Sequence, residues 1–273
     1  MSVSIQRLLQ AFGALTRNPT ILWRLTEREV ASRYRGSIFG WGWSLLNPLL
    51  MLAVYTFVFS TVFKARWPDL QEAGPIGFAI NLFAGLIVYS LFAECIGKAP
   101  TLVLSQPSYV TKVIFPLELL SAVAVGAAAF HACTSLVVLG LFELIAQGSI
   151  PLTALWLPLV WLPLLLGCLG LCWLLSALGV YLRDLPQLVN VGLSVLMFLS
   201  AIFYPVSALP ERWQPVLSLN PLVMVIEQTR AVLVSGQGPS PLYLGMSMPL
   251  SVVLCELCFR LFQKARRGFA DVI

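Results

Sequence analysis

Two cysteines near the end of the chain have the spacing of a metal-binding motif. Cys255 and Cys258 form a CxxC pair. A structural zinc site needs four nitrogen or sulfur ligands, however, and the sequence offers no second ligand pair. Because the pair also lies inside an apolar stretch, we interpret both cysteines as packing residues between helices. We therefore expect no metal site.

The other ionisable residues inside apolar stretches are isolated. His131 is the single histidine and lies in an alanine-rich stretch. It either hydrogen-bonds to a neighbouring helix, which we favour, or relays protons. Glu143 and Glu256 lie near the ends of apolar stretches, and Glu256 stands four residues before Arg260, which favours a local ion pair. Two isolated acids are few protonatable groups for a proton pathway, which argues against a proton-driven carrier.

The sequence lacks the residues that would bind a nucleotide or catalyse a reaction. No GxxxxGK[ST] motif occurs, so the chain does not hold nucleotide phosphates in a P-loop. Paired carboxylates or a metal cluster, which an enzyme acting on a lipid-phosphate sugar would need, are not found either. We expect no cofactor on this chain and no enzyme activity of its own. If transport is driven by ATP, the ATP, the magnesium ion and the ATPase belong to another polypeptide.

The elements that must position these residues are indicated by the composition, which predicts an all-α integral membrane protein. Of 273 residues, 59% are hydrophobic and 11% are charged, whereas a soluble domain carries about 25% charged residues. A helix needs about 20 apolar residues to cross a bilayer core of roughly 30 Å. Six transmembrane helices are therefore expected within 41–273, at about 41–63, 76–93, 119–146, 152–182, 185–204 and 242–262.

Residues 1–40 are predicted to form cytoplasmic or interfacial helices ahead of the spans. Asn18-Pro19 divides them, and the second helix is expected over about 21–35, with Glu29 and Arg33 as an i, i+4 ion pair. The segment lacks the short apolar core and cleavage site of a signal peptide. The first helix has the spacing of an amphipathic helix in the interface plane, through Ile5, Leu8, Leu9 and Phe12.

The distribution of positive charge predicts the orientation. With the N-terminus inside, most of the 17 Lys and Arg residues fall on the cytoplasmic side. The positive-inside rule therefore places both termini in the cytoplasm. The cytoplasmic set is Arg7, Arg17, Arg24, Arg28, Arg33, Arg35, Lys98, Lys112, Arg183, Arg260, Lys264, Arg266 and Arg267, and the outer set is Lys64, Arg66, Arg212 and Arg230.

The segment after the fifth span, 205–241, is too apolar for a solvated loop and too short for two full spans. Prolines interrupt it at Pro205, Pro210, Pro215 and Pro221. Two short helices that re-enter the outer leaflet and return would fit, and an ordinary interfacial hairpin is the alternative. We favour the re-entrant interpretation because apolar residues stand on both sides of each proline. Such backbone must be buried in protein or line a cavity.

Several segments, in order along nearly the whole chain, are similar to one family. They are 33–67 (RYRGSIFGWGWSLLNPLLMLAVYTFVFSTVFKARW), 106–120 (QPSYVTKVIFPLELL), 178–186 (LGVYLRDLP), the YP…LP…NP pattern of 203–221 and the ending RRGFADVI. On these motifs the chain resembles the permease subunits of polysaccharide and polyol-phosphate export ABC transporters. Within that family it is most similar to O-antigen (lipopolysaccharide) exporters, although Gln106-Pro-Ser stands where asparagines are expected.

The resemblance implies a homodimer in the bacterial inner membrane, joined by two copies of a separate ABC ATPase, with no nucleic-acid partner. The assembled complex would hydrolyse ATP to move an undecaprenyl-linked polysaccharide. In that family the connector between spans 2 and 3, here 94–118, carries a coupling helix that docks in the ATPase. This helix maps onto about 105–116, where the expected contacts are Tyr109, Lys112, Phe115 and Pro116.

The resemblance also implies that the helix before span 1 gates the admission of substrate at the cytoplasmic interface. Arg28, Arg33, Tyr34 and Arg35 match its position. A lipid pyrophosphate head needs cationic donors at the membrane surface, and arginine offers a bidentate fork. The same arginines would also serve as topology anchors, and both interpretations stay open.

The transport path of that family passes between the two copies, lined mostly by spans 1 and 5. A sliding sugar chain needs weak, repeated contacts, which aromatic faces provide. For any single ring, packing against lipid or another helix is the favoured alternative. The candidate rings are Trp43, Tyr55, Phe59, Phe198, Phe203 and Tyr204.

Other functions remain as alternatives to O-antigen export. The first is an ABC permease for a teichoic-acid-like polymer, a capsule, a lipid or a drug, which would have the same architecture. The second is a proton-coupled secondary carrier, which would depend on His131, Glu143 and Glu256. A membrane enzyme is disfavoured because its catalytic groups are missing.

Overall fold

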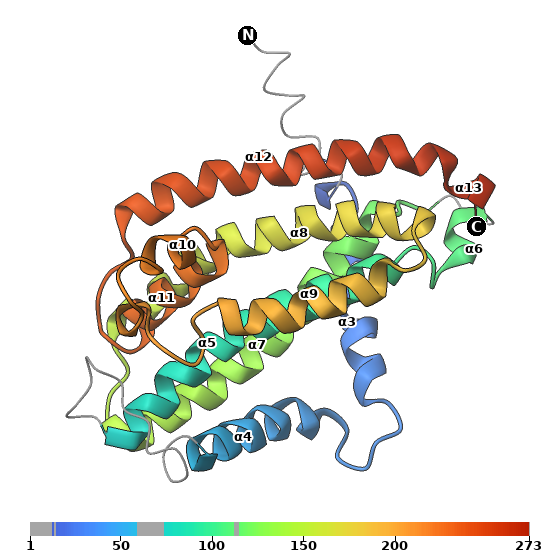
Figure 1. Ribbon diagram of the computed structural model, residues 1–273. Helices are drawn as coiled ribbons and strands as arrows, with labels where there is room; N and C mark the ends of the chain where they lie inside the picture. Colours follow the sequence, from blue (N-terminus) through green and yellow to red (C-terminus); the bar gives the residue numbers. More distant parts are fainter. Residues whose placement is uncertain (1–12, 14, 59–73, 112–114, 273) are drawn as a thin grey trace.

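The computed structural model describes residues 13, 15–58, 74–111 and 115–272, which form helices joined by turns (Figure 1). The all-α prediction is confirmed, because these residues contain no β-strand. The elements in chain order are α3 (Pro19–Tyr34), η1 (Gly40–Gly42), α4 (Trp43–Thr56), α5 (Gly74–Lys98), η4 (Ala99–Thr101), α6 (Pro107–Thr111), α7 (Glu118–Gln147), η5 (Leu152–Trp156), α8 (Leu157–Tyr181), α9 (Leu185–Leu199), η6 (Val206–Ala208), α10 (Gln214–Ser218), α11 (Pro221–Leu233), α12 (Pro241–Ala265), η7 (Arg266–Gly268) and α13 (Phe269–Val272).

The bundle has two ends that differ in what they carry (Figure 1). α10 and α11 lie together at one end, which we call the α11 end. α6, α13 and the C-terminus lie at the other, which we call the α6 end. α12 runs along one edge of the view in Figure 1 and α4 along the opposite edge.

Four of the described helices are long and apolar enough to cross a membrane. They cover 76–101, 118–146, 152–181 and 241–272, and they agree with the predicted spans 2, 3, 4 and 6. α9 is apolar but shorter, and α4, which contains Pro48, is described only as far as residue 58. The predicted count of six spans therefore stays a prediction.

Two helices end at other residues than the predicted spans, which were expected to end near residues 93 and 204. α5 continues to Lys98, so the predicted connector 94–118 begins with residues that are helical. α9 ends at Leu199 instead of reaching Tyr204, and the chain then turns sharply, with Ala201 at a φ of 51°. A positive φ is unusual for a residue other than glycine and marks a break that the surroundings must stabilise.

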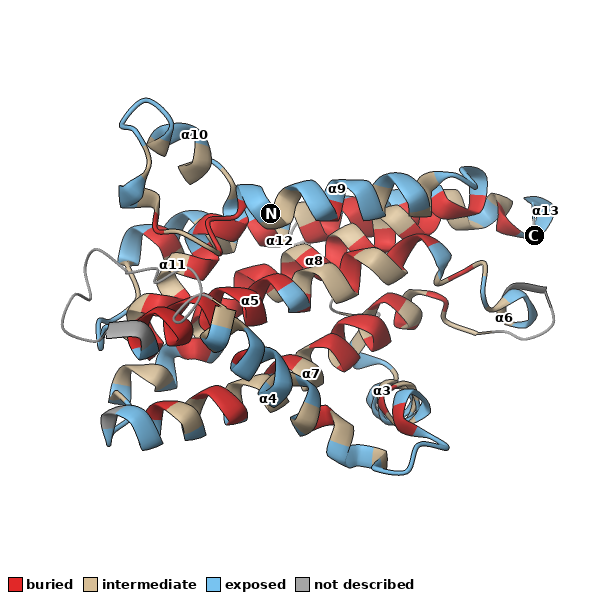
Figure 2. Ribbon diagram, turned by 60° about the horizontal axis from the view of Figure 1, so that its bottom comes forward, coloured by how far each residue is buried: buried red, intermediate tan, exposed pale blue. Residues whose placement is uncertain are grey.

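The core of the bundle is formed by α5 and α8, whose residues are mostly buried in Figure 2. Trp173 of α8 has no exposed surface, and its Nε1 donates a hydrogen bond to the backbone oxygen of Glu118. Glycines let neighbouring backbones come close to α8: a Cβ on Gly179 would overlap the carbonyl of Pro100, and a Cβ on Gly170 would lie 2.9 Å from the Cα of Cys255. Small residues at such contacts are typical of helix packing in membranes.

α3 begins at Pro19 with Asn18 as its N-cap residue, which confirms the predicted division at Asn18-Pro19. It packs on α7, where Gly126 makes room for the side chain of Thr26. Val30 and Tyr34 of α3 form a small buried cluster with Ala127 of α7. The predicted amphipathic helix before it, Ile5 to Phe12, lies outside the described residues.

The predicted re-entrant segment, 205–241, contains two helices of different character. α10 is short, and none of its residues is buried. α11 is longer and packs against α5 and α8, with eight of its residues buried. The side chain of Asn220 caps α11 by accepting a hydrogen bond from the backbone N–H of Leu222. The depth of both helices in a membrane stays a prediction.

Candidate functional site: a charged cluster between α3, α5 and α7

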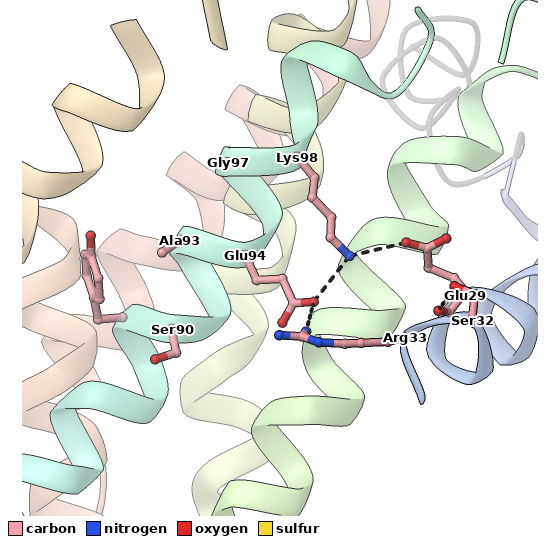
Figure 3. Close-up of a pocket in the computed structure, with 9 residues that line it drawn as sticks. Glu29, Ser32, Arg33, Ser90, Ala93, Glu94, Gly97 and Lys98 are labelled. Atoms are coloured by element: carbon pink, nitrogen blue, oxygen red, sulfur yellow. Dashed lines mark hydrogen bonds and ion pairs between the residues drawn. The ribbon is translucent and has the colours of Figure 1, made fainter. Parts of the chain in front are cut away.

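Four charged side chains and one histidine meet where α3 crosses the last turns of α5. Glu94 is at the centre, and Figure 3 shows it between Arg33 and Lys98. Arg33 Nη1 donates to Glu94 Oε1 at 2.8 Å, and Lys98 Nζ lies 3.4 Å from the same oxygen. His131 of α7 places Nδ1 2.9 Å from Glu94 Oε2. One carboxylate therefore joins three helices.

The predicted ion pair between Glu29 and Arg33 within α3 is wrong. Each residue instead bonds to α5: Glu29 to Lys98 at 3.2 Å and Arg33 to Glu94 at 2.8 Å (Figure 3). The geometry of α5 explains this, because Glu94 and Lys98 stand four residues apart and so share one face of that helix. Glu29 and Arg33 of α3 are also four residues apart and face Lys98 and Glu94. Each acid therefore pairs with a base on the other helix.

The interpretation of His131 as a hydrogen-bonding partner between helices is confirmed. Its Nδ1 reaches Glu94 of α5 and lies 3.1 Å from Arg33 Nη1 of α3. The predicted pair of Glu256 with Arg260 forms, and Glu94 pairs with Lys98 of α5 at the same i, i+4 spacing. Cys255 and Cys258 are both buried and unbridged, in agreement with a packing role. In the described part of the chain, no three His, Cys, Asp or Glu side chains gather as a metal site would require.

A cavity of about 630 Å³ opens beside this cluster. Its lining carries two acids and two bases, so the fixed charges balance. An anion that enters must therefore compete with Glu29 and Glu94 for the guanidinium of Arg33 and the ammonium of Lys98. The lining consists of Glu29, Ser32, Arg33, Tyr89, Ser90, Ala93, Glu94, Gly97 and Lys98.

The four residues predicted to gate substrate occupy different environments. Arg28 donates to the hydroxyl of Tyr109 at 3.3 Å, and Arg33 lies in the cluster. Tyr34 is 7% exposed and packs edge-on against His131, and burial raises the pKa of its hydroxyl. Arg35 follows the end of α3 and is exposed. The structure thus brings Arg33 and Tyr34 together around His131 and leaves Arg35 at the surface.

The predicted ATPase contacts lie on the connector between α5 and α7. The rings of Tyr109 and Phe115 stack with their centroids 4.4 Å apart, and Pro116 follows, half-buried. Lys112 lies outside the described residues. Because Arg28 of α3 bonds to Tyr109, this connector is joined directly to α3.

The far end of the connector is held by the C-terminal tail, which the sequence alone did not indicate. Arg266 Nη1 donates to Glu118 Oε2 at 2.8 Å, and its Nη2 donates to the backbone oxygen of Phe115 at 3.1 Å. Tyr181 of α8 donates to the backbone oxygen of Ala265 and so fixes the start of the tail. The only signal in the sequence is the basic ending, which the positive-inside rule and the family resemblance already explain.

The predicted rings of the transport path fall into separate groups. Phe198, Phe203 and Tyr204 lie together at the α11 end of α9, with the rings of Phe198 and Phe203 5.8 Å apart and the Tyr204 hydroxyl donating to the Phe198 carbonyl. Trp43 and Tyr55 lie near opposite ends of α4, and both are partly buried. Phe59 lies outside the described residues.

Four membrane-length helices among the described residues, packed around a buried core, indicate a multi-pass membrane protein. The chain belongs to the ABC-2 type transporter family, whose sequence model matches residues 20–234. This confirms the resemblance to ABC permeases. Membership implies a membrane context and an ABC ATPase as partner.

Similar proteins are known in several bacteria. The chain is 30% identical to the O-antigen export system permease protein RfbA of Myxococcus xanthus, over 93% of this chain and 95% of the relative. It is 24% identical to the O-antigen export system permease protein RfbA of Klebsiella pneumoniae, over 91% and 93% of the two chains. It is 22% identical to the polysialic acid transport protein KpsM of Escherichia coli, over 87% and 92%.

Proposed function

We propose that this chain is the transmembrane subunit of an ATP-driven ABC exporter that moves an undecaprenyl-linked polysaccharide of the O-antigen type across the bacterial inner membrane. The observation that carries this proposal is the similarity to the O-antigen permease of Myxococcus xanthus, which extends over 93% of this chain. A separate ATPase would hold the ATP and the magnesium ion, because this sequence has no P-loop motif.

The proposed topology has six spans and both termini in the cytoplasm. Four membrane-length helices support it, and α4 and α9 would supply the remaining two spans. The α6 end would face the cytoplasm, because the helix ends that carry Lys98, Arg183 and Lys264 gather positive charge there. The α11 end, with the re-entrant segment, would then face outwards.

The proposed transport path lies between two copies of the chain. α9 supports this with an apolar stripe that is left uncovered, on residues that recur every three or four positions and so share one face of the helix. α4 exposes a second apolar face. The α9 stripe consists of Leu188, Val191, Val195 and Phe198, each more than half exposed.

The charged cluster is the proposed place where the lipid head is admitted. A pyrophosphate carries enough negative charge to displace the Glu94 carboxylate from Arg33. The Arg33 side chain is 49% exposed and lines the cavity. Arginine binds phosphate with two parallel hydrogen bonds, so the exchange replaces one charge-assisted contact by a bidentate one. Glu94 would then return to Arg33 when the head moves on, which keeps binding reversible.

Two experiments test the proposal. The tagged chain should co-purify from membranes with a P-loop ATPase and with a second copy of itself. Deletion of its gene should remove the polysaccharide from the cell surface, and the wild-type gene should restore it. Retention of the surface polymer after deletion, or transport by the chain alone in liposomes without nucleotide, would reject the proposal.

A capsule polysaccharide is the second candidate substrate. The similarity to the polysialic acid transport protein of Escherichia coli favours it, although the identity is lower, at 22%. The two candidates differ in the polymer that accumulates inside the deletion strain. Loss of long-chain lipopolysaccharide with an intact capsule supports O-antigen export, and the converse supports capsule export.

A further inference from the structure

The break at the end of α9 leaves backbone carbonyls without helical partners. α9 stops at Leu199, and the chain passes through Ala201 at a φ of 51° before η6 begins. Ser200, Ala201 and Ile202 are nevertheless completely buried. Backbone polar groups in a dry environment must find hydrogen-bond donors inside the protein. The donors at this break come from α11.

Arg230 of α11 supplies most of these donors. Arg230 is only 3% exposed, although the positive-inside rule assigned it to the outer set of charges. Nη1 donates to the carbonyl of Ala201 at 3.0 Å and Nη2 to the carbonyl of Ile202 at 2.8 Å. Nε donates to the carbonyl of Asn81 in α5 at 3.0 Å. One guanidinium thus ties the broken end of α9 to α5.

The charge of Arg230 is balanced locally. Glu227, one turn earlier in α11, accepts from Nη1 at 2.8 Å. The guanidinium fork offers five N–H donors in a plane, and here it uses them towards three carbonyls and one carboxylate. A lysine would bring a single ammonium and could not reach both the α5 carbonyl and the α9 carbonyls in the same way.

A glycine in α5 makes room for this guanidinium. A Cβ on Gly85 would lie 2.9 Å from Arg230 Nη2 and 3.3 Å from Ile226 Cγ2. The absence of a side chain at this position therefore has a specific consequence, since any larger residue would push the fork away from the break. This observation is independent of the hydrogen bonds of Arg230.

Asn220 fixes the same break from a second side. Its Nδ2 donates to the carbonyl of Leu199 at 3.1 Å and lies 3.3 Å from Ser200 Oγ. Its Oδ1 caps α11. The last turn of α9 and the first turn of α11 are therefore joined by one amide, and Arg230 joins both to α5.

We propose that Arg230 is a positioning residue that fixes the outer end of α9 and thereby keeps the transport path closed while no polymer occupies it. The inference rests on the proposed function, in which α9 lines that path. Phe203 and Tyr204 follow the clamped carbonyls directly, and Tyr204 folds back onto the Phe198 carbonyl. When the clamp holds, this ring cluster is fixed at the α11 end of the path. When the clamp is lost, the rings can swing away.

Dye retention in vesicles tests this inference. The complete complex with its ATPase is reconstituted into vesicles loaded with a small self-quenching anionic dye, and leakage is measured without ATP. Arg230→Gln and Gly85→Ala should each raise the leak rate several-fold over wild type. Gly245→Ala on α12 is the matched control, because a Cβ there meets nothing within 4 Å, and it should leak like wild type.

A double substitution separates a specific clamp from general damage. Arg230→Lys lacks the Nη2 atom that a Cβ on residue 85 would meet, so Gly85→Ala should add little leakage in that background. In the protein that keeps Arg230, Gly85→Ala should raise the leak rate several-fold. Equal added leakage in both backgrounds would contradict the role given to the guanidinium.

Wild-type leak rates in Arg230→Gln and Gly85→Ala, with normal amounts in the membrane, would overturn the inference. If Arg230→Gln does not accumulate, Gly85→Ala and Asn220→Ala decide in the same way. If none of the three accumulates, Arg230 serves folding alone and the inference is rejected. Polysaccharide export by the wild-type complex is measured in parallel, so that a failure of the proposed function is recognised separately.

Discussion

At the scale of single residues, Glu94 determines the character of the charged cluster. Its side chain is 16% exposed, and it faces Arg33, Lys98 and His131 at once. The pair with Lys98 could be predicted from sequence, because both residues belong to one helix. The contacts to Arg33 and His131 could not, since they depend on how α3 and α7 cross α5.

Replacing Glu94 by Gln should strengthen the binding of a phosphate head, because the carboxylate no longer competes for Arg33. The expected gain in affinity for a soluble prenyl pyrophosphate is roughly threefold to tenfold, equivalent to about 1 kcal/mol for a partly exposed charge pair. Export should slow, since release becomes harder. Titration calorimetry on the purified complex measures the first effect, and surface polysaccharide measures the second.

The matched variants are Arg33→Ala and Arg24→Ala, which remove one positive charge each from α3. Arg33→Ala should weaken binding, whereas Arg24→Ala should change it little, because Arg24 is exposed and does not line the cavity. Weaker binding by Glu94→Gln would show that the carboxylate supports the site instead of competing with the ligand.

Glu143→Gln should leave export unchanged. Glu143 is 1% exposed, and its Oε1 finds no hydrogen-bond partner among the described residues. A glutamine of the same shape fills this buried position without removing a hydrogen bond from Oε1, so packing around residue 143 should be kept. Surface polysaccharide in a complemented deletion strain is the measurement. Loss of export with a normal amount of protein would instead favour a proton-coupled carrier.

At the scale of helices, most of the fold could be predicted because a bilayer imposes a length and a composition on each span. The limits of α7, α8 and α12 agree with the expected apolar stretches within a few residues. The end of α9 could not be predicted. Residues up to Tyr204 are apolar enough to continue the helix, and the break depends on donors from Arg230, far along the chain.

Gly179→Ala should prevent normal accumulation of the protein, whereas Gly167→Ala should not. Both glycines belong to α8, but a Cβ on Gly179 would overlap the carbonyl of Pro100, and a Cβ on Gly167 meets nothing within 4 Å. Overpacking of a tight helix contact costs about 1–3 kcal/mol or more. Immunoblots of membranes and thermal unfolding of the purified protein measure the difference. Equal stability of the two variants would mean that α8 and η4 are farther apart.

Arg266→Ala should separate ATP hydrolysis from transport. Arg266 holds the end of the connector through the Phe115 carbonyl and Glu118, so its loss leaves the proposed docking segment less firmly attached to α7 and α12. Export per ATP hydrolysed should fall several-fold. Arg267→Ala removes the same charge from an exposed neighbour and should retain the wild-type ratio. An equal fall in both variants would assign the effect to net charge.

At the scale of the whole molecule, the exposed apolar residues form two surfaces, one on α4 and α9 and the other on α12. In the proposed assembly the first surface contacts the second copy and the second surface contacts lipid. α9 and α4 expose apolar faces beside the proposed path. α12, which runs along the edge opposite α4 in Figure 1, exposes a further apolar face that includes Leu250 and Val253. In a membrane protein an exposed apolar face meets lipid or another protein, so composition does not say which. The sequence could therefore predict the spans but not which of their faces join two copies.

Val191→Cys should form a disulfide between two copies on mild oxidation, and Leu250→Cys should not. Val191 stands in the middle of the α9 stripe, and Leu250 lies on α12. Both variants are made with Cys133→Ala, because Cys133 is the exposed cysteine among the described residues. Non-reducing gels give the measurement. Cross-linking through Leu250 alone would move the interface between copies to α12.

The connector is tied at one end to α3 by Arg28 and at the other to the tail by Arg266. A permease combined with the ATPase of another transporter would need a connector that matches that ATPase. A transplanted connector would lack its partners on α3 and the tail. These three segments, far apart in the gene, form one exchangeable module. Chimaeras that transplant all three should work where single-segment grafts fail.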